Sequence, residues 1–113
     1  MTAENALSRD RICALNDAFR RSFGGGTVVV TAGFESLSGD RRPTILARIR
    51  AFDQFNEDND PHGEHDFGGM VVDGETVLFK IDYYDLTLTA GSEDPANTAI
   101  TRRVMTVMLA ADY

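Results

Sequence analysis

Residues 67–84 have the sequence FGGMVVDGETVLFKIDYY, which predicts a β-hairpin. Asp73-Gly74 favours a two-residue turn, because both residues accept the positive φ that such a turn needs. The residues that follow the turn alternate between an apolar face and a mixed one. The apolar face holds Val77, Phe79, Ile81 and Tyr83, and the mixed face holds Leu78, Lys80, Asp82 and Tyr84. We therefore predict strands over 67–72 and 75–84, in a sheet that buries one face.

A helix is predicted over residues 6–23. Its apolar residues fall on one arc at helical spacing: Leu7, Ile12, Ala14, Leu15, Ala18, Phe19 and Phe23. The opposite arc carries Arg9, Asn16, Asp17 and Arg20. Cys13 projects on the polar side, so we expect a partly exposed thiol. Gly24-Gly25-Gly26 ends the helix, since glycine adopts the left-handed conformation found at helix C-termini.

Two further elements are predicted between this helix and the hairpin. The run of β-branched residues at 27–31 predicts a buried strand over 27–32. Residues 33–39 form a connection, and Asp40 caps a helix over 41–54 with Pro43 in its first turn.

After the hairpin, Leu86 and Leu88 either extend the second strand or belong to a fourth one. Asp94-Pro95 predicts the start of a last helix over 95–111, because proline is favoured at the first helical position. We expect a single α+β domain over residues 1–113. Three helices would pack on a small antiparallel sheet of three to four strands.

Charge is distributed unevenly along the 113 residues, whose net charge is −7. Residues 1–52 carry eight arginines and five acids, whereas residues 53–94 carry twelve acids and one lysine. Direct binding to nucleic acid is not expected for such a chain, because phosphates would be repelled over much of its surface. The asymmetry instead predicts a surface that attracts a partner with a basic face.

The single cysteine excludes an intrachain disulfide, and no apolar run approaches the ~20 residues that span a bilayer. No signal peptide is expected, because the first residues carry charge early and contain no apolar stretch. We therefore expect a cytoplasmic protein with no membrane contact. Cys13 lacks the features of a catalytic nucleophile, and Gly24-Gly25-Gly26 precedes a strand, whereas phosphate-binding loops lead from a strand into a helix. No catalytic residue is predicted.

The loop at residues 53–66 is where the candidate functional residues concentrate. One hypothesis is a docking surface for a basic partner, made by Glu57, Asp58, Asp60, Glu64 and Asp66, with Tyr83 and Tyr84 as aromatic anchors. A second is a divalent metal site, made by His62, His65, Asp58 and Asp60. A calcium loop is not completed, because Gly69 stands where the bidentate glutamate belongs. A third interpretation is a polar loop fixed by side-chain-to-backbone hydrogen bonds.

Several segments resemble a bacterial family called domain of unknown function 3768. They are RIRAFD at 48–53, EDNDPHGEHDF at 57–67, KIDYYD at 80–85, GSEDP at 91–95 and TRRV at 101–104. The resemblance runs from about Arg11 to Tyr113. It transfers no activity, cofactor or catalytic residue. Members of this family are often found in genomes rich in plasmids and mobile elements, which implies a role in conflict or regulation.

These observations lead to two expectations for function. The first is a small, acidic, non-enzymatic interaction or inhibitor protein, encoded by a mobile element. It would act on a nucleic-acid-binding defence complex of the CRISPR or restriction type by phosphate mimicry. The alternative is a small metal-binding domain or metal-dependent enzyme that uses the acidic, histidine-containing loop.

Overall fold

The hairpin at Asp73-Gly74 organises the fold, as predicted. In the computed structural model, which describes residues 3–113, β2 (Phe67–Val72) pairs antiparallel with β3 (Glu75–Tyr84). Asp73 and Gly74 have φ values of 49° and 83°, as a two-residue hairpin turn requires. The predicted apolar face of β3 is buried at Val77, Phe79 and Ile81.

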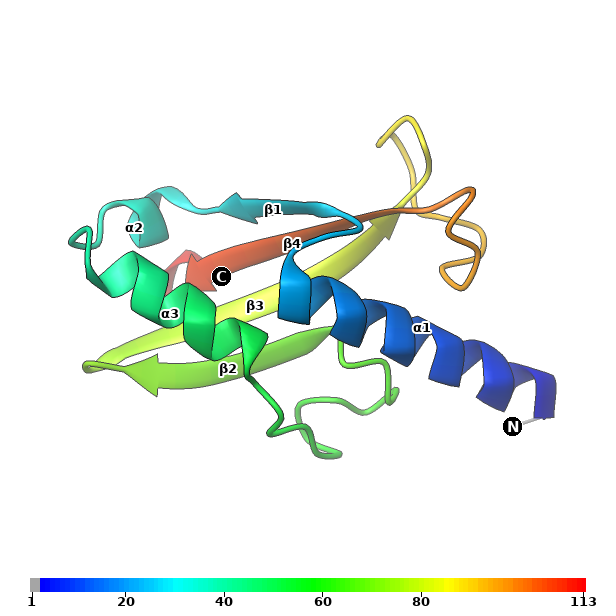
Figure 1. The fold of residues 1–113 in the computed structure, drawn as a ribbon, viewed down its shortest axis with the longest axis horizontal. Helices are drawn as coiled ribbons and strands as arrows, with labels where there is room; N and C mark the ends of the chain where they lie inside the picture. The colour runs from blue at the N-terminus through cyan, green and yellow to red at the C-terminus, as the bar shows by residue number, and fades with distance from the viewer. Residues whose placement is uncertain (1–2) are drawn as a thin grey trace.

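The sheet has four strands in the order β1-β4-β3-β2 (Figure 1). β4 (Arg102–Leu109) pairs antiparallel with β3 and parallel with β1 (Thr27–Val30). The α+β class is confirmed, but the sheet is mixed and not wholly antiparallel. β1 is shorter than the predicted strand and is an edge strand, so it is largely exposed and not buried as expected.

The predicted helix over 95–111 is wrong. Residues 102–109 form β4, and Arg103, Met105 and Val107 alternate as its buried residues. The segment from Asp85 to Thr101 consists mainly of turns, so Leu86 and Leu88 lie in a loop and not in a strand. Pairing with β3 along eight register positions outweighs the helical spacing of the apolar residues, since β4 fills the middle of the sheet.

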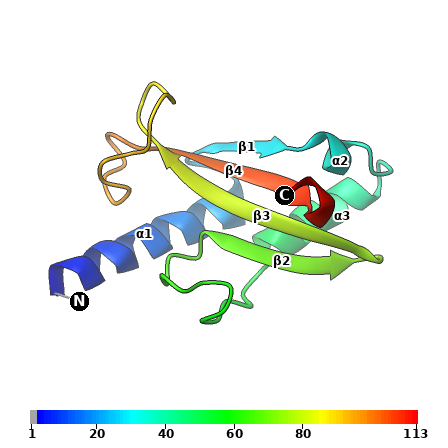
Figure 2. The same cartoon turned by 180° about the vertical axis from the view of Figure 1, so that it is seen from behind.

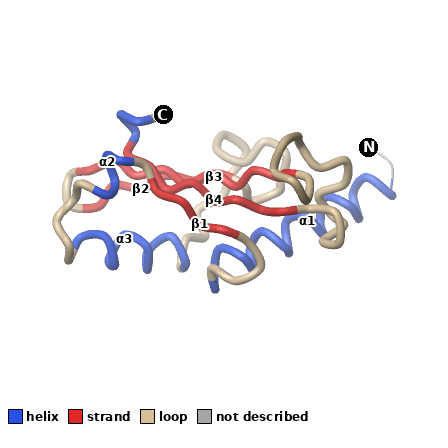
Figure 3. The backbone as a smooth tube through the Cα atoms, turned by 90° about the horizontal axis from the view of Figure 1, so that it is seen from above, coloured by secondary structure: helices blue, strands red, loops and turns tan. Residues whose placement is uncertain are grey.

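The longer helices α1 (Ala3–Ser22) and α3 (Arg41–Arg50) lie on the same face of the sheet (Figure 3). Seen from behind, the opposite face carries no long helix of the described residues; the short η1 turn (Ala110–Asp112) stands at one end of it and the loops between β3 and β4 at the other (Figure 2). The predicted connection at 33–39 contains a further short helix, α2 (Ala32–Glu35). α3 ends at Arg50, four residues earlier than predicted, and Asp40 precedes it without a side-chain capping bond.

The core fills the space between the sheet and these helices. It is built from Phe19, Phe34, Ile45, Ile49, Phe52, Val72, Val77, Phe79, Ile81, Met105 and Val107. Gly68 is required for this packing, because a Cβ there would lie 2.5 Å from Cε2 of Phe79. β2 therefore passes directly over the aromatic rings.

The buried face of α1 differs from the predicted apolar arc. Asn16 and Arg20 are buried beside Ile12 and Phe19, whereas Leu7 is 70% exposed. The first turns of the helix extend past the end of the sheet, and Leu7 lies on this part of the helix (Figure 1). The polar residues are buried instead because other segments supply their hydrogen-bond partners.

Candidate functional site

A buried polar network joins α1 to the acidic loop at 53–66 and to the two central strands. At its centre, the amide nitrogen of Asn16 donates to Oη of Tyr83 at 2.7 Å and to the main-chain oxygen of Glu64 at 3.0 Å. The amide oxygen of Asn16 accepts from Nε of Arg103 at 2.8 Å. One side chain therefore links β3, β4 and the loop.

Arg103 completes this network from β4. Its Nη2 donates to the main-chain oxygen of Pro95 at 2.6 Å, and its guanidinium lies 5.2 Å from the centre of the Tyr83 ring. Tyr83 in turn donates to Oε1 of Glu64 at 2.7 Å. Burial, and then this bond to Glu64, raises the pKa of Tyr83, so its phenol stays protonated and keeps the carboxylate in place.

A second group lies between α1 and the same loop. Nδ1 of His65 and Nη1 of Arg20 each lie 2.8 Å from Oδ1 of Asp17 and donate to it. Burial would raise the pKa of Asp17, but the hydrogen bonds from Arg20 and His65 outweigh it and hold that pKa below its usual value. Phe55 stacks on the His65 ring at 3.9 Å, and the guanidinium of Arg20 lies 5.1 Å from the centre of the Phe55 ring. The loop is therefore joined to α1 by the hydrogen bond from His65 to Asp17 and by the contact between Arg20 and Phe55.

The loop is also fixed internally by side-chain-to-backbone hydrogen bonds. Oδ1 of Asn56 accepts the backbone N–H groups of Asp58 and Asn59, and Oδ1 of Asp60 accepts those of Glu64 and His65. Gly63 and His65 have positive φ values of 69° and 56°, which these bonds hold. The third interpretation of the loop, as a segment fixed by such bonds, is confirmed.

The structure divides the predicted docking residues into two sets. Glu57 and Asp58 are exposed at the tip of the loop, and their carboxylates make no hydrogen bond or ion pair with any described residue. Asp60 is buried, and Glu64 and Asp66 are half-buried. Burial, and then the nearby charge of Glu64, raises the pKa of Asp66, as expected where carboxylates crowd together.

The two tyrosines lie on opposite faces of β3. Tyr83 is occupied by the internal network, whereas Tyr84 is half-buried on the face without α1 and α3 and pairs with Arg102 of β4 in the sheet register. Of the two, Tyr84 is the one whose position leaves its ring available to a partner.

Of the four predicted metal ligands, His65 and Asp60 lie together, with Nε2 of His65 3.6 Å from Oδ2 of Asp60, but the four do not form one group among the described residues. Among residues 3–113, ligand atoms from three residues come within 4.8 Å of one another only at Cys13, Asp17 and His65. His62 is exposed and stands outside this group, as do Asp58 and Asp60.

Cys13, a member of this group, is half-buried, as its helical position predicted. Burial, followed by the charges of Asp17 and Asp60, raises the pKa of the Cys13 thiol to about 11. The thiol is therefore protonated near neutral pH, whereas nucleophilic attack and metal binding by cysteine both need the thiolate.

Sequence reasoning missed Asn16, Arg20 and Arg103 as parts of the site. Asn16 and Arg20 are four residues apart and therefore share one face of α1. That spacing was the available signal, but nothing local shows that the face is covered. The sequence around Arg103 contains no such signal. A charged residue is rarely buried in a strand without partners, and the partners of Arg103 come from distant segments that only the fold brings close.

None of the helices in the described part of the chain is long and apolar enough to cross a membrane. No curated protein and no solved structure matches the chain. A family model described as "Protein of unknown function (DUF3768)" matches residues 30–112, which include the loop, the hairpin and β4 but not α1. The match spans more than half of the sequence, and the chain belongs to this family.

Proposed function

We propose that the protein is a non-enzymatic interaction module whose acidic loop docks on a basic surface of a partner protein. The observation that carries this proposal is the contrast within the loop. Its backbone is held by Asn56, Asp60 and the network around Asn16, while the carboxylates of Glu57 and Asp58 are exposed and form no hydrogen bond or ion pair within the described part of the chain. A surface that is already ordered loses little conformational entropy when it binds.

The partner class follows from charge. A basic surface large enough to hold acids that repel one another is typical of proteins that bind nucleic acids, where lysine and arginine hold the phosphates. The loop would compete for such a surface in the cytoplasm and so act as an inhibitor. A restriction-type or CRISPR-type effector complex, in a cell that carries mobile elements, is the target class we infer.

Competition with DNA tests the proposal. The fluorescence anisotropy of a labelled DNA duplex is measured while it is bound to a purified restriction-type or CRISPR-type effector, and the protein is titrated in. We expect the anisotropy to fall as DNA is displaced. Glu57→Gln with Asp58→Asn should weaken displacement, and raising the salt should reduce the difference, because the Debye length is ~8 Å at physiological ionic strength.

The matched control removes the same two charges elsewhere. Glu35→Gln with Asp40→Asn changes exposed acids around α2 and the start of α3. This variant should displace DNA as well as the wild type does. If both double variants lose the same activity, net charge and not the loop is responsible. If the wild type displaces DNA from neither effector class, the inferred target is wrong.

A second candidate function is binding of a divalent metal, which the grouping of Cys13, Asp17 and His65 favours. Sulfur, imidazole and carboxylate ligands together suit zinc. Against this, Arg20 lies 2.8 Å from Asp17 and places a positive charge beside the site. Zinc binding would have to displace that ion pair, which makes the interaction module the better-supported function.

A further inference from the structure

The free edge of β2 presents unpaired backbone groups. Because Asp73-Gly74 is a two-residue turn, Val72 and Glu75 form a hydrogen-bonded pair, and such pairs recur at every second residue. The N–H and C=O groups of Phe67, Gly69 and Val71 therefore point away from β3. Among the described residues, no segment lies beyond β2 in the sheet to receive them.

This edge lacks the usual protection against strand pairing. Proteins commonly guard an edge strand with charged residues, proline or a bulge. β2 has the sequence FGGMVV, without charge or proline, and it pairs with β3 at six consecutive register positions. Val71 is 61% exposed. The edge is therefore open to an additional strand.

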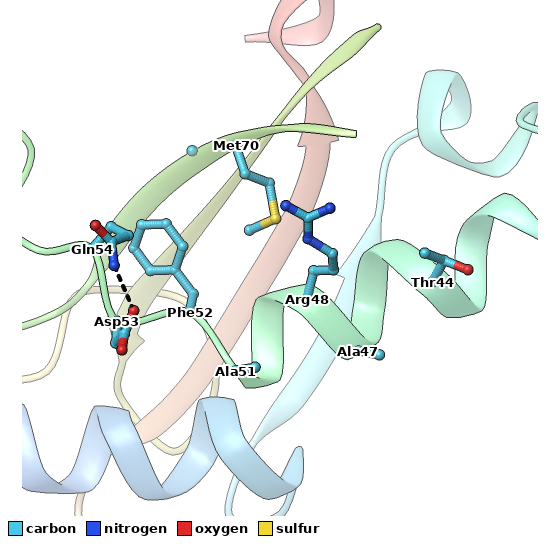
Figure 4. A pocket seen from close by; sticks show the side chains of 9 residues that line it. Thr44, Ala47, Arg48, Ala51, Phe52, Asp53, Gln54 and Met70 are labelled. Atoms are coloured by element: carbon cyan, nitrogen blue, oxygen red, sulfur yellow. Dashed lines mark hydrogen bonds between the residues drawn. The ribbon is translucent and has the colours of Figure 1, made fainter. Parts of the chain in front are cut away.

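A groove runs beside this edge, between β2 and α3 (Figure 4). It has a volume of about 570 Å³. Ala47 of α3, Ala51 directly after this helix, Phe52 and Met70 line it with apolar surface. Arg48 extends from α3 across the groove towards Met70. A strand paired with β2 would place every second side chain in this groove, since successive side chains point to opposite faces.

The charge of α3 indicates which side chains would enter. The helix carries Arg41, Arg42, Arg48 and Arg50 and no acidic residue. Arg48 is exposed and makes no hydrogen bond or ion pair with any described residue. Asp53, at the end of the groove, already accepts from Nε2 of Gln54 at 2.8 Å. This amide is neutral, so Asp53 keeps its negative charge, and the positive charge of the groove stands at Arg48 on α3.

We propose that β2 and α3 form a binding site for an extended acidic segment of a partner protein, which adds to the sheet as a fifth strand. Backbone hydrogen bonds to Gly69 and Val71 hold the segment, an apolar side chain packs on Met70, and a carboxylate pairs with Arg48. This is strand addition combined with a side-chain pocket. The site is separate from the tip of the acidic loop, so the protein has two surfaces of opposite charge for two kinds of segment.

A synthetic peptide tests the proposal. The probe repeats Thr-Glu-Thr-Val, which places Glu and Val in turn on the groove side, and a control peptide has Lys in place of Glu. Binding is measured by NMR titration of the ¹⁵N-labelled full chain. We expect the amide signals of Phe67, Gly69 and Val71 to shift, and the acidic peptide to bind about tenfold more tightly than the control peptide.

Two pairs of variants identify the contacts. Val71→Pro removes an outward N–H without removing a bond to β3, whereas Val71→Thr keeps that N–H. The proline variant should lose binding and the threonine variant should keep it. Arg48→Glu should abolish the preference for the acidic peptide, and Arg21→Glu, which makes the same change at an exposed position of α1, should not. If Val71→Pro is not properly folded, as judged by loss of cooperative unfolding, the comparison of Arg48→Glu with Arg21→Glu alone tests the proposal.

Several results would overturn this inference. The first is equal binding of the acidic and lysine peptides. The second is peptide-induced shifts located outside β2 and α3. The third is a concentration-dependent dimer, seen by analytical ultracentrifugation, that Val71→Pro dissociates, because the occupant of the edge would then be a second copy of the chain.

Discussion

Replacing Asn16 by alanine tests whether the buried network holds the acidic loop in place. The change removes three hydrogen bonds, to Tyr83, to the main chain of Glu64 and from Arg103. Tyr83 keeps its bond to Glu64, and Arg103 keeps its bond to Pro95. Nε of Arg103 and the main-chain oxygen of Glu64 lose a partner inside the protein.

The expected cost is large because a charged group is left without a partner. Arg103 is 4% exposed, so water does not replace the lost bond. An unsatisfied buried group costs about 1–3 kcal/mol, and breaking the partnership of a buried charge costs about 3–5 kcal/mol. We expect Asn16→Ala to lower the free energy of unfolding by about 3–5 kcal/mol. Domains of this kind have a stability of only about 5–15 kcal/mol in total.

Urea denaturation followed by circular dichroism measures this loss. With an m value of about 2 kcal/mol/M, the midpoint should fall by about 2 M. Asn97→Ala, the same truncation at an exposed position where the amide oxygen accepts one backbone N–H, that of Ala99, should cost no more than about 1 kcal/mol. In a double-mutant cycle with Arg103→Met, the two changes should couple by about 1–3 kcal/mol, because each removes the same bond.

A second readout connects this stability to the site. The amide signals of residues 57–66 should shift in Asn16→Ala even where the variant is fully folded, since Glu64 loses its anchor on α1. A cost below about 0.5 kcal/mol, additivity in the cycle, or unchanged loop signals would each show that the network does not position the loop.

Three further predictions concern the titratable groups around the loop. Cys13→Ser should change stability by less than about 0.5 kcal/mol, and a thiol reagent should react slowly at neutral pH and faster as the pH approaches 11, the approximate pKa of the thiol. Asp66→Asn should stabilise the protein at neutral pH. Because the pKa of Asp66 is raised in the folded protein, the wild type loses stability as the pH rises from the ordinary aspartate pKa through the folded value. The stabilisation by Asp66→Asn should therefore disappear in acid, and a stabilisation that is independent of pH would refute this. Melting curves of the wild type with and without a chelator should coincide. The metal site would be favoured instead if the chelator lowered the melting temperature of the wild type, zinc restored it, and His65→Ala showed neither effect.

The parts of the fold that depend on local chemistry could be predicted from the sequence. Asp73-Gly74 determines its own turn, and the alternation at Val77, Phe79 and Ile81 shows which face of β3 is buried. α3 lies within the predicted range of 41–54, with Ile45 and Ile49, four residues apart, buried on one face. The family resemblance is confirmed as well.

The C-terminal strand was missed for a reason that lies outside its own residues. Its buried residues alternate from Arg103, so a strand interpretation requires an arginine inside the protein. The sequence around Arg103 offers no compensation, because Asn16 comes from the first helix and Tyr83 from β3. Asp94-Pro95 also has the residue types typical of a helix start. In the structure these residues begin a turn, in which Oδ1 of Asp94 accepts the N–H of Ala96.

The loop shows the same division between local and distant information. Its hydrogen-bonded caps at Asn56 and Asp60 were among the interpretations that the sequence allowed, since both residue types favour such bonds. Which acids remain free could not be predicted. The carboxylate of Glu64 is bound by Tyr83, and that of Asp60 accepts backbone N–H groups of its own turn. Glu57 and Asp58 remain exposed.

The position of β4 has a consequence for synthesis of the chain. β4 follows β1, β2 and β3 in the sequence but lies between β1 and β3 in the sheet. A ribosome adds about 5–20 residues per second, so the three earlier strands emerge before their shared neighbour. Until residues 102–109 leave the exit tunnel, β1 has no strand to pair with, and β3 exposes its backbone on one side. We expect the nascent chain to hold only the β2–β3 hairpin and helical segments. The sheet would then form in a single late step, during which chaperones have access to the apolar side chains of the unfinished core.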